Sequence, residues 1–354
     1  MKSKVILLLT AILLATGCED NYTPPPPAPA PPPLPPVEET PDNGEEGTGG
    51  TEEPKVEIPF KDVIIYPEFK EDFNEATSFL RFAAKANGGE DFRYFSAHPS
   101  LSEKNNSTKI MMMRIDPADN EGWGKGPQVI TKDYTFYGSY ATRLRVPDTK
   151  KAQKNLGAAA GLYVYDIDEK YGHSEIGIEL RLADPTKVYL YAITGEEGKL
   201  NTISRTVDLA AGSIKDCSYS ANGGTSTALT DAQNAPSTIK SISGFDASKK
   251  LYIYGFDWSA EKITWWLRES DSAEKVILWE YEGKELFPGT YAPMGIPVLP
   301  AQNATSFWHS TSRLAHGLSS AKEAPKYPYE MEIDWMSYTP FQDAIDAWKE
   351  EAKK

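Results

Sequence analysis

Apolar and polar residues alternate strictly through residues 174–180 (SEIGIEL). Alternation with a period of two predicts a β-strand with two different faces. Glu175, Gly177 and Glu179 would share one face, and the two isoleucines between them would share the other. The isoleucines would pack inward, so the two carboxylates would line either a wet outer surface or a cleft.

Short apolar runs and further alternating runs predict more strands. One alternating run places two arginines together on its polar face, and another places Tyr189 and Tyr191 on one face, where we expect packing. Residues 211–240, which follow these runs, are polar and are expected to form a long loop. The strand patterns occur at residues 110–115, 134–146, 188–193 and 276–281.

The end of the chain has the pattern of a short amphipathic helix. Thr339 is the expected N-cap, Pro340 the first helical residue, and Gln342 the return partner of a capping box. Apolar residues then recur at helical spacing, which gives the helix one face that can dock on the outside of a larger fold. These residues are Phe341, Ile345 and Trp348.

The first residues have the form of a secretory signal peptide. Two lysines precede the apolar run 5–15, which is too short to span a bilayer as a mature helix. The run ends in Ala-Thr-Gly-Cys18, which resembles a bacterial lipobox, and the resemblance implies cleavage before Cys18 and lipid attachment to its sulfur. An ordinary secretory signal with a chance cysteine is the alternative. The acidic pair after Cys18 resembles the export signal of Bacteroidetes-type surface lipoproteins, which implies lipid anchoring at the bacterial outer membrane and exposure at the cell surface.

A tether follows the signal peptide. Residues 24–36 are almost all proline, which favours a stiff polyproline II spacer, and residues 38–57 are rich in Glu, Gly and Thr, as in disordered segments. Residues 1–57 hold ten acids and three lysines, a net charge of −7 out of −14 for the chain. The remaining chain is therefore only mildly acidic and has no basic patch of the kind that binds nucleic acid. We expect a signal peptide at 1–17, a lipidated tether at 18–57 and one β-domain at 58–354.

The cysteines and histidines exclude several kinds of site. With Cys18 lipidated, Cys217 has no disulfide partner and is expected to be a small buried residue. The four histidines show no paired zinc-ligand spacing, and the chain has neither a Gly-rich phosphate loop nor a Gly-x-Ser-x-Gly elbow. The sequence therefore predicts no metal centre and no cofactor.

The paired carboxylates offer the most specific chemistry. Glycoside hydrolysis uses two of them, one as nucleophile or base and the other as proton donor. A solvated strand whose charges simply point outward has the same pattern.

Four further blocks resemble, in order, the motifs of glycoside hydrolase family 16, the concanavalin A-like lectin/glucanase group. Residues 174–180 themselves are similar to the family's Glu-x-Asp-x-Glu signature. The resemblance implies an all-β, two-sheet antiparallel β-sandwich of the concanavalin A-like jelly-roll type, with the short C-terminal helix outside it. It also implies a retaining endo-β-glycanase with Glu175 as nucleophile and Glu179 as acid/base. The supporting blocks lie at 137–147, 156–165, 254–265 and 329–338, and residues 66–73 resemble the family's opening strand.

Two departures from the family pattern weaken the implied catalysis. Gly177 stands where the family has an Asp that orients the nucleophile and helps to keep the proton donor protonated. The absence of this Asp would lower the rate of hydrolysis by about 10²–10⁴-fold unless another group compensates. Small residues at 157–161 also stand where sugar-stacking aromatics are expected. The candidates to compensate for the missing Asp are Asp166, Asp168 and Asp184.

Four side chains are candidates to bind the glycan. Trp123 lies in a Gly-rich loop (GWGKG), where its ring could stack on a sugar face or cover the core. The resemblance implies that Arg143 orients the carboxylates and that Trp308 and His309 line a subsite on a late concave strand. An exposed arginine and two buried core residues are the alternatives. Family members often carry a structural calcium, for which no ligand set is legible in this sequence.

Three functions fit these observations. The first is a surface-anchored retaining endo-glycanase that acts on an extracellular polysaccharide. The second is a non-catalytic glycan-binding lipoprotein on the same fold, which the absence of the signature Asp favours. The third is a purely structural surface protein. Neither the glycan and its linkage nor the oligomeric state is specified by the sequence.

Overall fold

The computed structural model describes residues 63–74, 80–82, 91–95, 109–117, 126–168, 171–309 and 323–351. The predicted signal peptide, the lipidation site Cys18, the tether and Trp123 lie outside the described residues. No helix in these ranges is long and apolar enough to cross a membrane.

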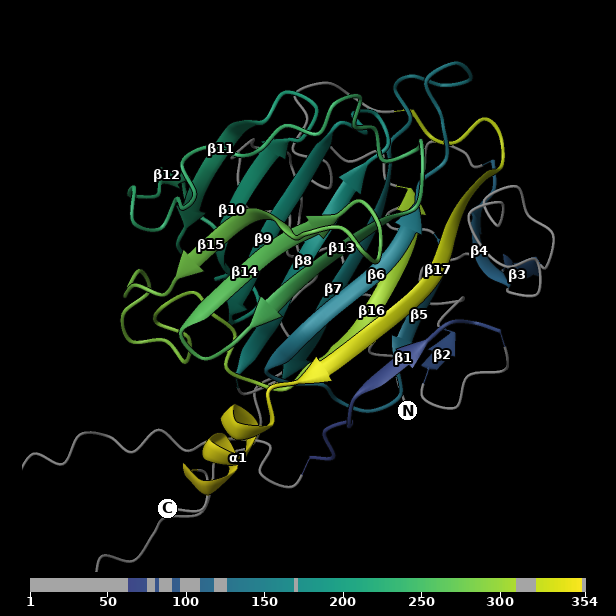
Figure 1. Ribbon diagram of the computed structural model, residues 1–354. Helices are drawn as coiled ribbons and strands as arrows, with labels where there is room; N and C mark the ends of the chain where they lie inside the picture. Colours follow the sequence, from purple (N-terminus) through teal and green to yellow (C-terminus); the bar gives the residue numbers. More distant parts are fainter. Residues whose placement is uncertain are drawn as a thin grey trace, which may run out of the picture. The chain divides into compact units, whose positions relative to one another are not determined.

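The described residues form two antiparallel sheets that lie face to face (Figure 1). We call them the β6 sheet and the β8 sheet. The β6 sheet has the order β15 (Val276–Glu282), β14 (Lys262–Arg268), β13 (Tyr252–Trp258), β6 (Gly138–Arg145), β17 (Tyr329–Pro340), β4 (Ile110–Ile115) and β3 (Asp91–Phe95), with β1 (Phe69–Glu71) paired to β17. The β8 sheet has the order β12 (Thr227–Ala228), β11 (Ser213–Ser220), β10 (Asn201–Asp208), β9 (Lys187–Gly195), β8 (Gly172–Arg181), β7 (Ala158–Asp168), β16 (Gln302–His309), β5 (Gln128–Thr131) and β2 (Leu80–Phe82).

The hydrophobic core lies between the sheets. Ile176 and Ile178 of β8 are fully buried in it, as the alternation predicts. Trp265 of β14 crosses the core, and its indole N–H donates to the carbonyl oxygen of Gly177 at 3.1 Å. This bond fixes the β6 sheet against the central part of β8, because an indole N–H buried in a core needs an acceptor.

The two neighbouring tryptophans of β14 show how strictly the strands alternate. Trp265 is fully buried in the core, while Trp266 lies on the outer face of the β6 sheet among Ala141, Ile253 and Trp335. Adjacent residues of a strand point to opposite faces, which is why the two rings lie on different sides of the sheet.

The helix α1 (Gln342–Glu351) packs with its predicted apolar residues toward the sandwich. Ile345 and Trp348 are buried, and the Trp348 ring lies 4.8 Å from that of Phe136, whereas Phe341 is 37% exposed. The predicted capping box is wrong. β17 continues through Pro340, so the hydroxyl of Thr339 donates to Glu68 instead of capping the helix.

The prediction of a long loop at 211–240 is also wrong. This segment contains β11, which pairs along its whole length with β10, and the short β12. β11 lies near the edge of the sheet, where only the two-residue β12 pairs with its other side, and most of its residues are half-buried or exposed. Cys217 of β11 is half-buried, and burial raises the pKa of its thiol to about 12.

The predicted fold class, an all-β two-sheet antiparallel sandwich with a short C-terminal helix, is confirmed.

Candidate active site

The two carboxylates lie on the outer face of the β8 sheet. Glu175, Gly177 and Glu179 alternate with the core isoleucines of β8, so all three face away from the other sheet. The strands β7 and β9 flank β8 and bring a tyrosine beside Gly177 from each side, Tyr163 and Tyr191. The site is thus built on the centre of a paired sheet, where neighbouring strands hold its backbone on both sides.

Glu175 is held by two side chains. The hydroxyl of Tyr191 donates to its Oε1 at 2.7 Å, and the Nε2 of His173 lies 2.7 Å from its Oε2. Glu175 is 6% exposed. Contacts to both carboxylate oxygens fix the orientation of the group, which is what a positioned nucleophile requires.

Glu179 lies in a different environment. It is 1% exposed, and the Nε of Arg181 donates to its Oε1 at 2.7 Å. Burial raises the pKa of the Glu179 carboxyl, Arg181 opposes the increase, and the charge of Glu175 adds to it. The guanidinium of Arg181 also stacks 4.3 Å over the ring of Tyr189. A carboxyl whose proton is retained more firmly than usual is suited to act as a proton donor.

The ring of Tyr191 occupies the space beside Gly177. A Cβ atom added to Gly177 would lie 2.5 Å from both Cζ and the hydroxyl oxygen of Tyr191, far inside van der Waals contact. Tyr191 stacks on Tyr189 at 5.4 Å between ring centroids. The phenol of the neighbouring strand therefore fills the space beside Gly177 and donates a hydrogen bond to Glu175.

Gly177→Asp is expected to destabilise the protein by about 1–3 kcal/mol, because the new side chain must displace the Tyr191 ring. The free energy of unfolding, measured by denaturant titration, checks this, with Gly177→Ala as the control that adds volume without charge. The same substitution should cost clearly less in a Tyr191→Ala background, and an equal cost in both backgrounds would contradict the steric account.

With Glu175 as the nucleophile that the family resemblance implies, Tyr191→Phe is expected to lower kcat for glycan hydrolysis by about 10–100-fold with little change in KM. The substitution removes only the hydroxyl that donates to Glu175, and a hydrogen bond to a charged group contributes about 1.5–3 kcal/mol. Steady-state kinetics provide the measurement. Tyr327→Phe is the matched control, since Tyr327 is 52% exposed. A loss of less than about twofold in Tyr191→Phe would show that the contact does not serve catalysis.

Trp308 of β16 covers a second glycine, close to Glu179. Gly161 pairs with both Glu179 and Ser306, and a Cβ on Gly161 would lie 3.3 Å from the Trp308 ring. Trp308 is 8% exposed, and its indole N–H has no hydrogen-bond partner among the residues that the structure describes. The small residues of β7 therefore make room for an aromatic ring from the next strand, and Trp308 lies on the same face of the β8 sheet as the carboxylates.

A buried polar network continues this face beyond Gly177. The Nε2 of Gln128 donates to the hydroxyl of Tyr163 at 2.5 Å, and this hydroxyl lies 2.5 Å from the Oγ of Ser306. Burial is the main cause that raises the pKa of Tyr163, so the phenol stays neutral. The network adds polar atoms next to the carboxylates without adding charge.

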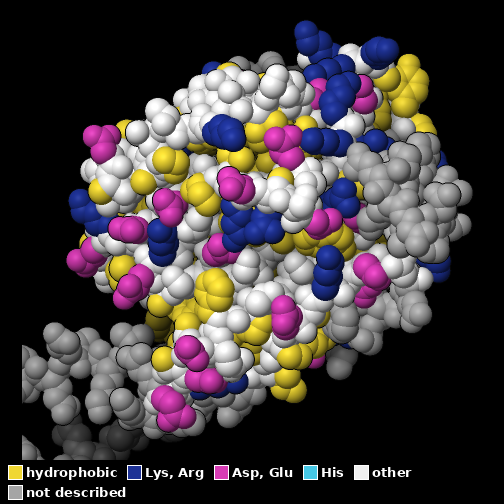
Figure 2. All heavy atoms as spheres, in the orientation of Figure 1, with side chains coloured by type: hydrophobic (Ala, Val, Ile, Leu, Met, Phe, Trp, Pro, Cys, Tyr) yellow, Lys and Arg dark blue, Asp and Glu magenta, His cyan; other side chains and the backbone are white. Residues whose placement is uncertain are grey.

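Arg143 does not orient the carboxylates, contrary to the prediction. It belongs to the β6 sheet and faces outward, so the whole core separates it from Glu175. Its Nη1 forms a buried ion pair with Asp334 at 2.9 Å and lies 3.6 Å from Asp271. Figure 2 shows the molecule from the side of the β6 sheet, where basic and acidic side chains are interspersed rather than gathered by sign.

The structure also separates His309 from Trp308. The two are adjacent on β16, so their side chains leave opposite faces, and His309 pairs with the core residue Ala158. His309 is 3% exposed on the inner side. The expectation that both line one subsite is therefore wrong for His309.

None of the three aspartates proposed as compensators takes the place of the missing Asp. The Oδ1 of Asp168 accepts the backbone N–H of Tyr171, and Asp184 binds Thr186 and Lys187 within its own turn. Asp166 pairs with Ser174, on the face of β7 opposite to Tyr165. The compensating donor is Tyr191, for which the sequence predicted only packing.

Three side chains that contact the two carboxylates, His173, Tyr191 and Arg181, were not predicted as site residues from the sequence. His173 and Arg181 lie two residues before Glu175 and two after Glu179, so the period of two already places both on the carboxylate face. Tyr191 could not be found in this way, because its position beside Gly177 depends on the register between β8 and β9.

The described residues contain no group of three or more His, Cys, Asp or Glu side chains that could hold a metal ion.

Comparisons with known proteins give similarity of fold alone. No protein-family model matches the chain, and no curated protein sequence matches it. A prokaryotic beta-1,3-1,4-glucanase (lichenase) from a mouse hindgut metagenome is 18% identical, with a TM-score of 0.45 over 78% of this chain and 100% of that chain. The Bacillus licheniformis beta-glucanase is 17% identical, with a TM-score of 0.44 over 77% and 98% of the two chains. A Bacteroides ovatus mixed-linkage glucan GH16 protein in complex with a G4G4G3G product is 12% identical, with a TM-score of 0.44 over 76% and 99%. These TM-scores are below 0.5, and the fold assignment stands on the strand pairing described above.

Proposed function

We propose that this chain is a carbohydrate-active protein, a retaining endo-β-glycanase that hydrolyses O-glycosidic bonds of an extracellular polysaccharide. The observation that carries the proposal is the placement of Glu175 and Glu179 on one face of β8 in two different environments. Two carboxyl groups with distinct environments are the minimum equipment for this reaction.

In the proposed mechanism Glu175 is the nucleophile. Its carboxylate attacks the anomeric carbon and forms a covalent glycosyl–enzyme ester, while the bond to the leaving oxygen breaks. Tyr191 and His173 contact both of its oxygens and hold it in one orientation for this attack. A water molecule then displaces Glu175 and releases the sugar with its original anomeric configuration.

Glu179 is the acid and then the base. It gives its proton to the leaving glycosidic oxygen in the first step and takes a proton from the attacking water in the second. Burial, which raises the pKa of this carboxyl, favours the protonated form that the first step needs. Arg181 opposes this effect and favours the ionised form that the second step needs.

The surrounding face has the groups that recognise sugars. Trp308 offers a broad ring and an unpaired N–H donor next to Glu179, and Tyr163 and Ser306 offer hydroxyls beside Gly177. Aromatic faces pack against the C–H surfaces of sugar rings, and protein hydroxyl groups can exchange hydrogen bonds with the hydroxyl groups of a sugar.

A glycan-binding protein without turnover is the second candidate. It is supported by the absence of an Asp at position 177, by the ion pair that holds Glu179 to Arg181, and by the near-complete burial of both carboxyl groups. In that case the same face would bind the polysaccharide and leave it intact.

We further propose that the protein is anchored by lipid at Cys18 to the bacterial outer membrane and faces outward. The lipobox-like motif, the acidic residues after it and the proline-rich segment support this arrangement. A tether of this composition would hold the sandwich away from the membrane, where long polysaccharides are accessible.

A panel of β-glucans, agars and carrageenans tests the two candidates. The proposed enzyme releases new reducing ends from at least one polysaccharide of the panel. A protein that is retained on a polysaccharide affinity gel but releases no reducing ends from the same polysaccharide would be the glycan-binding alternative.

A further inference from the structure

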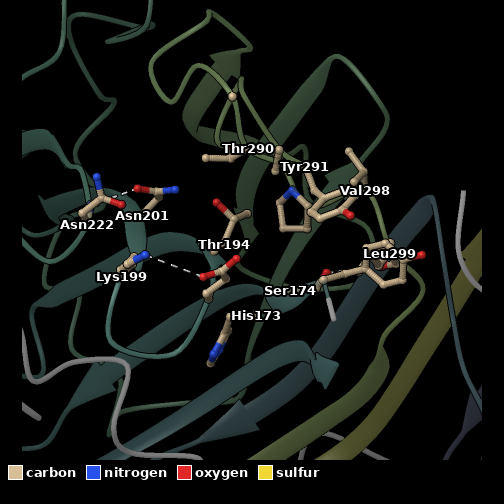
Figure 3. A pocket seen from close by; sticks show the side chains of 16 residues that line it. His173, Ser174, Thr194, Lys199, Asn201, Asn222, Thr290, Tyr291, Val298 and Leu299 are labelled. Carbon is tan, nitrogen blue, oxygen red and sulfur yellow. Dashed lines mark hydrogen bonds and ion pairs between the residues drawn. The ribbon is translucent and has the colours of Figure 1, made fainter. Parts of the chain in front are cut away.

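A pocket of about 230 Å³ lies at one end of the sandwich and reaches the carboxylate face only at His173. Its walls come from the ends of β8, β9 and β10 and from the segment 289–299 (Figure 3). Ser174 and Thr194 are paired across β8 and β9 on the side opposite to Glu175. The pocket therefore opens between the sheets and not over the two carboxylates.

Two buried polar atoms in this pocket lack a partner. Thr194 and Asn201 are each 2% exposed, and both line the pocket. The hydroxyl of Thr194 and the Nδ2 amide of Asn201 make no hydrogen bond to any part of the chain that the structure describes. The Oδ1 of Asn201 accepts the backbone N–H of Asn222 at 3.0 Å, which fixes the amide with its donor side unused. Buried groups of this kind are normally satisfied, so the pocket is prepared for a polar ligand.

Charge and size narrow the class of ligand. Lys199 and Glu196, which also line the pocket, form an ion pair at 4.0 Å. Their opposite charges cancel, and both side chains are about 70% exposed, so this pair gives the pocket no net charge. The volume is far above the ~30 Å³ of one water molecule and below the roughly 300–1,000 Å³ of pockets for larger organic ligands. A single small ring with several hydroxyl groups fits these limits.

Two tyrosines complete the pocket. Tyr291 is 40% exposed at the rim, and its ring meets that of Tyr171 edge-on at 4.6 Å. An exposed aromatic ring beside unused polar donors is the combination that holds a sugar, whose ring has both a C–H face and a hydroxyl edge.

We infer that this pocket binds one neutral pyranose sugar, as a monosaccharide or as the end of a glycan chain, separately from the carboxylate face. The ring of Tyr291 would cover the sugar, and Thr194 and Asn201 would hydrogen-bond its hydroxyl groups. His173 lines the pocket and also contacts Glu175, so the two sites share one side chain. Equilibrium binding of a monosaccharide does not depend on hydrolysis, so a binding measurement tests this inference separately from the proposed enzyme activity.

Saturation-transfer NMR titrations of the full chain with D-glucose, D-galactose and D-mannose test the inference. At least one sugar should bind with a Kd of about 1–10 mM, as expected for a ligand of this size. Thr194→Val, which keeps the shape but removes the hydroxyl, and Tyr291→Ala should each weaken binding about fivefold or more. Tyr327→Ala, at another exposed tyrosine outside both sites, should leave the Kd unchanged.

Several results would overturn the inference. Absence of binding by all three sugars up to about 100 mM would do so. Binding that persists in both pocket variants would place the sugar elsewhere. Tighter binding of inorganic phosphate that Thr194→Val abolishes would show that the pocket accepts an anion instead.

Discussion

Glu175→Gln is expected to lower kcat for glycan hydrolysis by at least about 10³-fold while the protein stays folded and still binds its polysaccharide. Gln has the same shape as Glu, so Tyr191 can still donate to the oxygen at this position. An amide cannot attack the anomeric carbon to form the glycosyl–enzyme ester, and this step has no substitute in the site. The loss should therefore fall on kcat.

Reducing-end release and retention on a polysaccharide gel provide the two measurements for Glu175→Gln. Glu269→Gln is the matched control, because Glu269 is an exposed partner of Lys250 on the other sheet. Equal rates for Glu175→Gln and the parent would remove Glu175 from the mechanism.

Glu179→Gln is expected to lower the hydrolysis rate by about 10²–10⁴-fold, the usual contribution of a positioned proton donor. In the parent the alkaline limb of the pH–rate profile should follow the ionisation of Glu179. Because burial raises the pKa of this carboxyl, the parent should remain active above the pH range in which an ordinary glutamate loses its proton. The pH–rate profile of Glu179→Gln should lack this alkaline limb. An unchanged alkaline limb in the variant would show that another group causes it.

The same substitution should also change stability in a pH-dependent way. The pKa of Glu179 is higher in the folded state than in the unfolded state, where it is about 4.3. As pH rises above that value the unfolded chain loses the proton first, so the parent becomes less stable until Glu179 ionises in the folded state as well. Gln does not ionise, so the stability of Glu179→Gln lacks this pH dependence. The Tm of the variant minus the Tm of the parent should therefore increase from pH 4 toward neutrality. A constant difference across this range would contradict the raised pKa.

Local pattern predicted most of the fold. The period of two in residues 174–180 predicted β8 and its two faces, and the apolar run at 110–115 coincides with β4. The strand in the segment 211–240 was not predicted because β11 is only partly buried and shows no strict alternation of apolar and polar residues. Its pairing with β10 makes it a strand, and that pairing is not visible in the sequence of β11 alone. The capping box at Thr339 failed for a similar reason, since pairing with β6 extends β17 through that residue.

The site was less predictable, because its geometry comes from register between strands. Glu175 and Glu179 follow from one strand alone. The replacement of the missing Asp by the Tyr191 phenol depends on the pairing of β8 with β9, which no short stretch of sequence encodes. Arg143 was assigned to the site by resemblance, but alternation and sheet order place it on the far side of the core.

Gly177 and Gly161 have a common explanation in the structure. Each lies on the carboxylate face, and each is covered by a ring from a neighbouring strand, Tyr191 and Trp308. Residues that are small on one strand therefore permit aromatic residues on the next. The small residues at positions 161 and 177 are thus accompanied by aromatic rings from the neighbouring strands.

The anomeric configuration of the first product tests the central proposal most directly. Proton NMR would follow the protein as it cleaves whichever β-glucan gives reducing ends, before the product mutarotates. The pairing of a nucleophile with an acid/base predicts a β-configured product, formed with retention. An α-configured first product would contradict the role of Glu175 as nucleophile, and bound polysaccharide that stays uncleaved would make the protein a glycan binder.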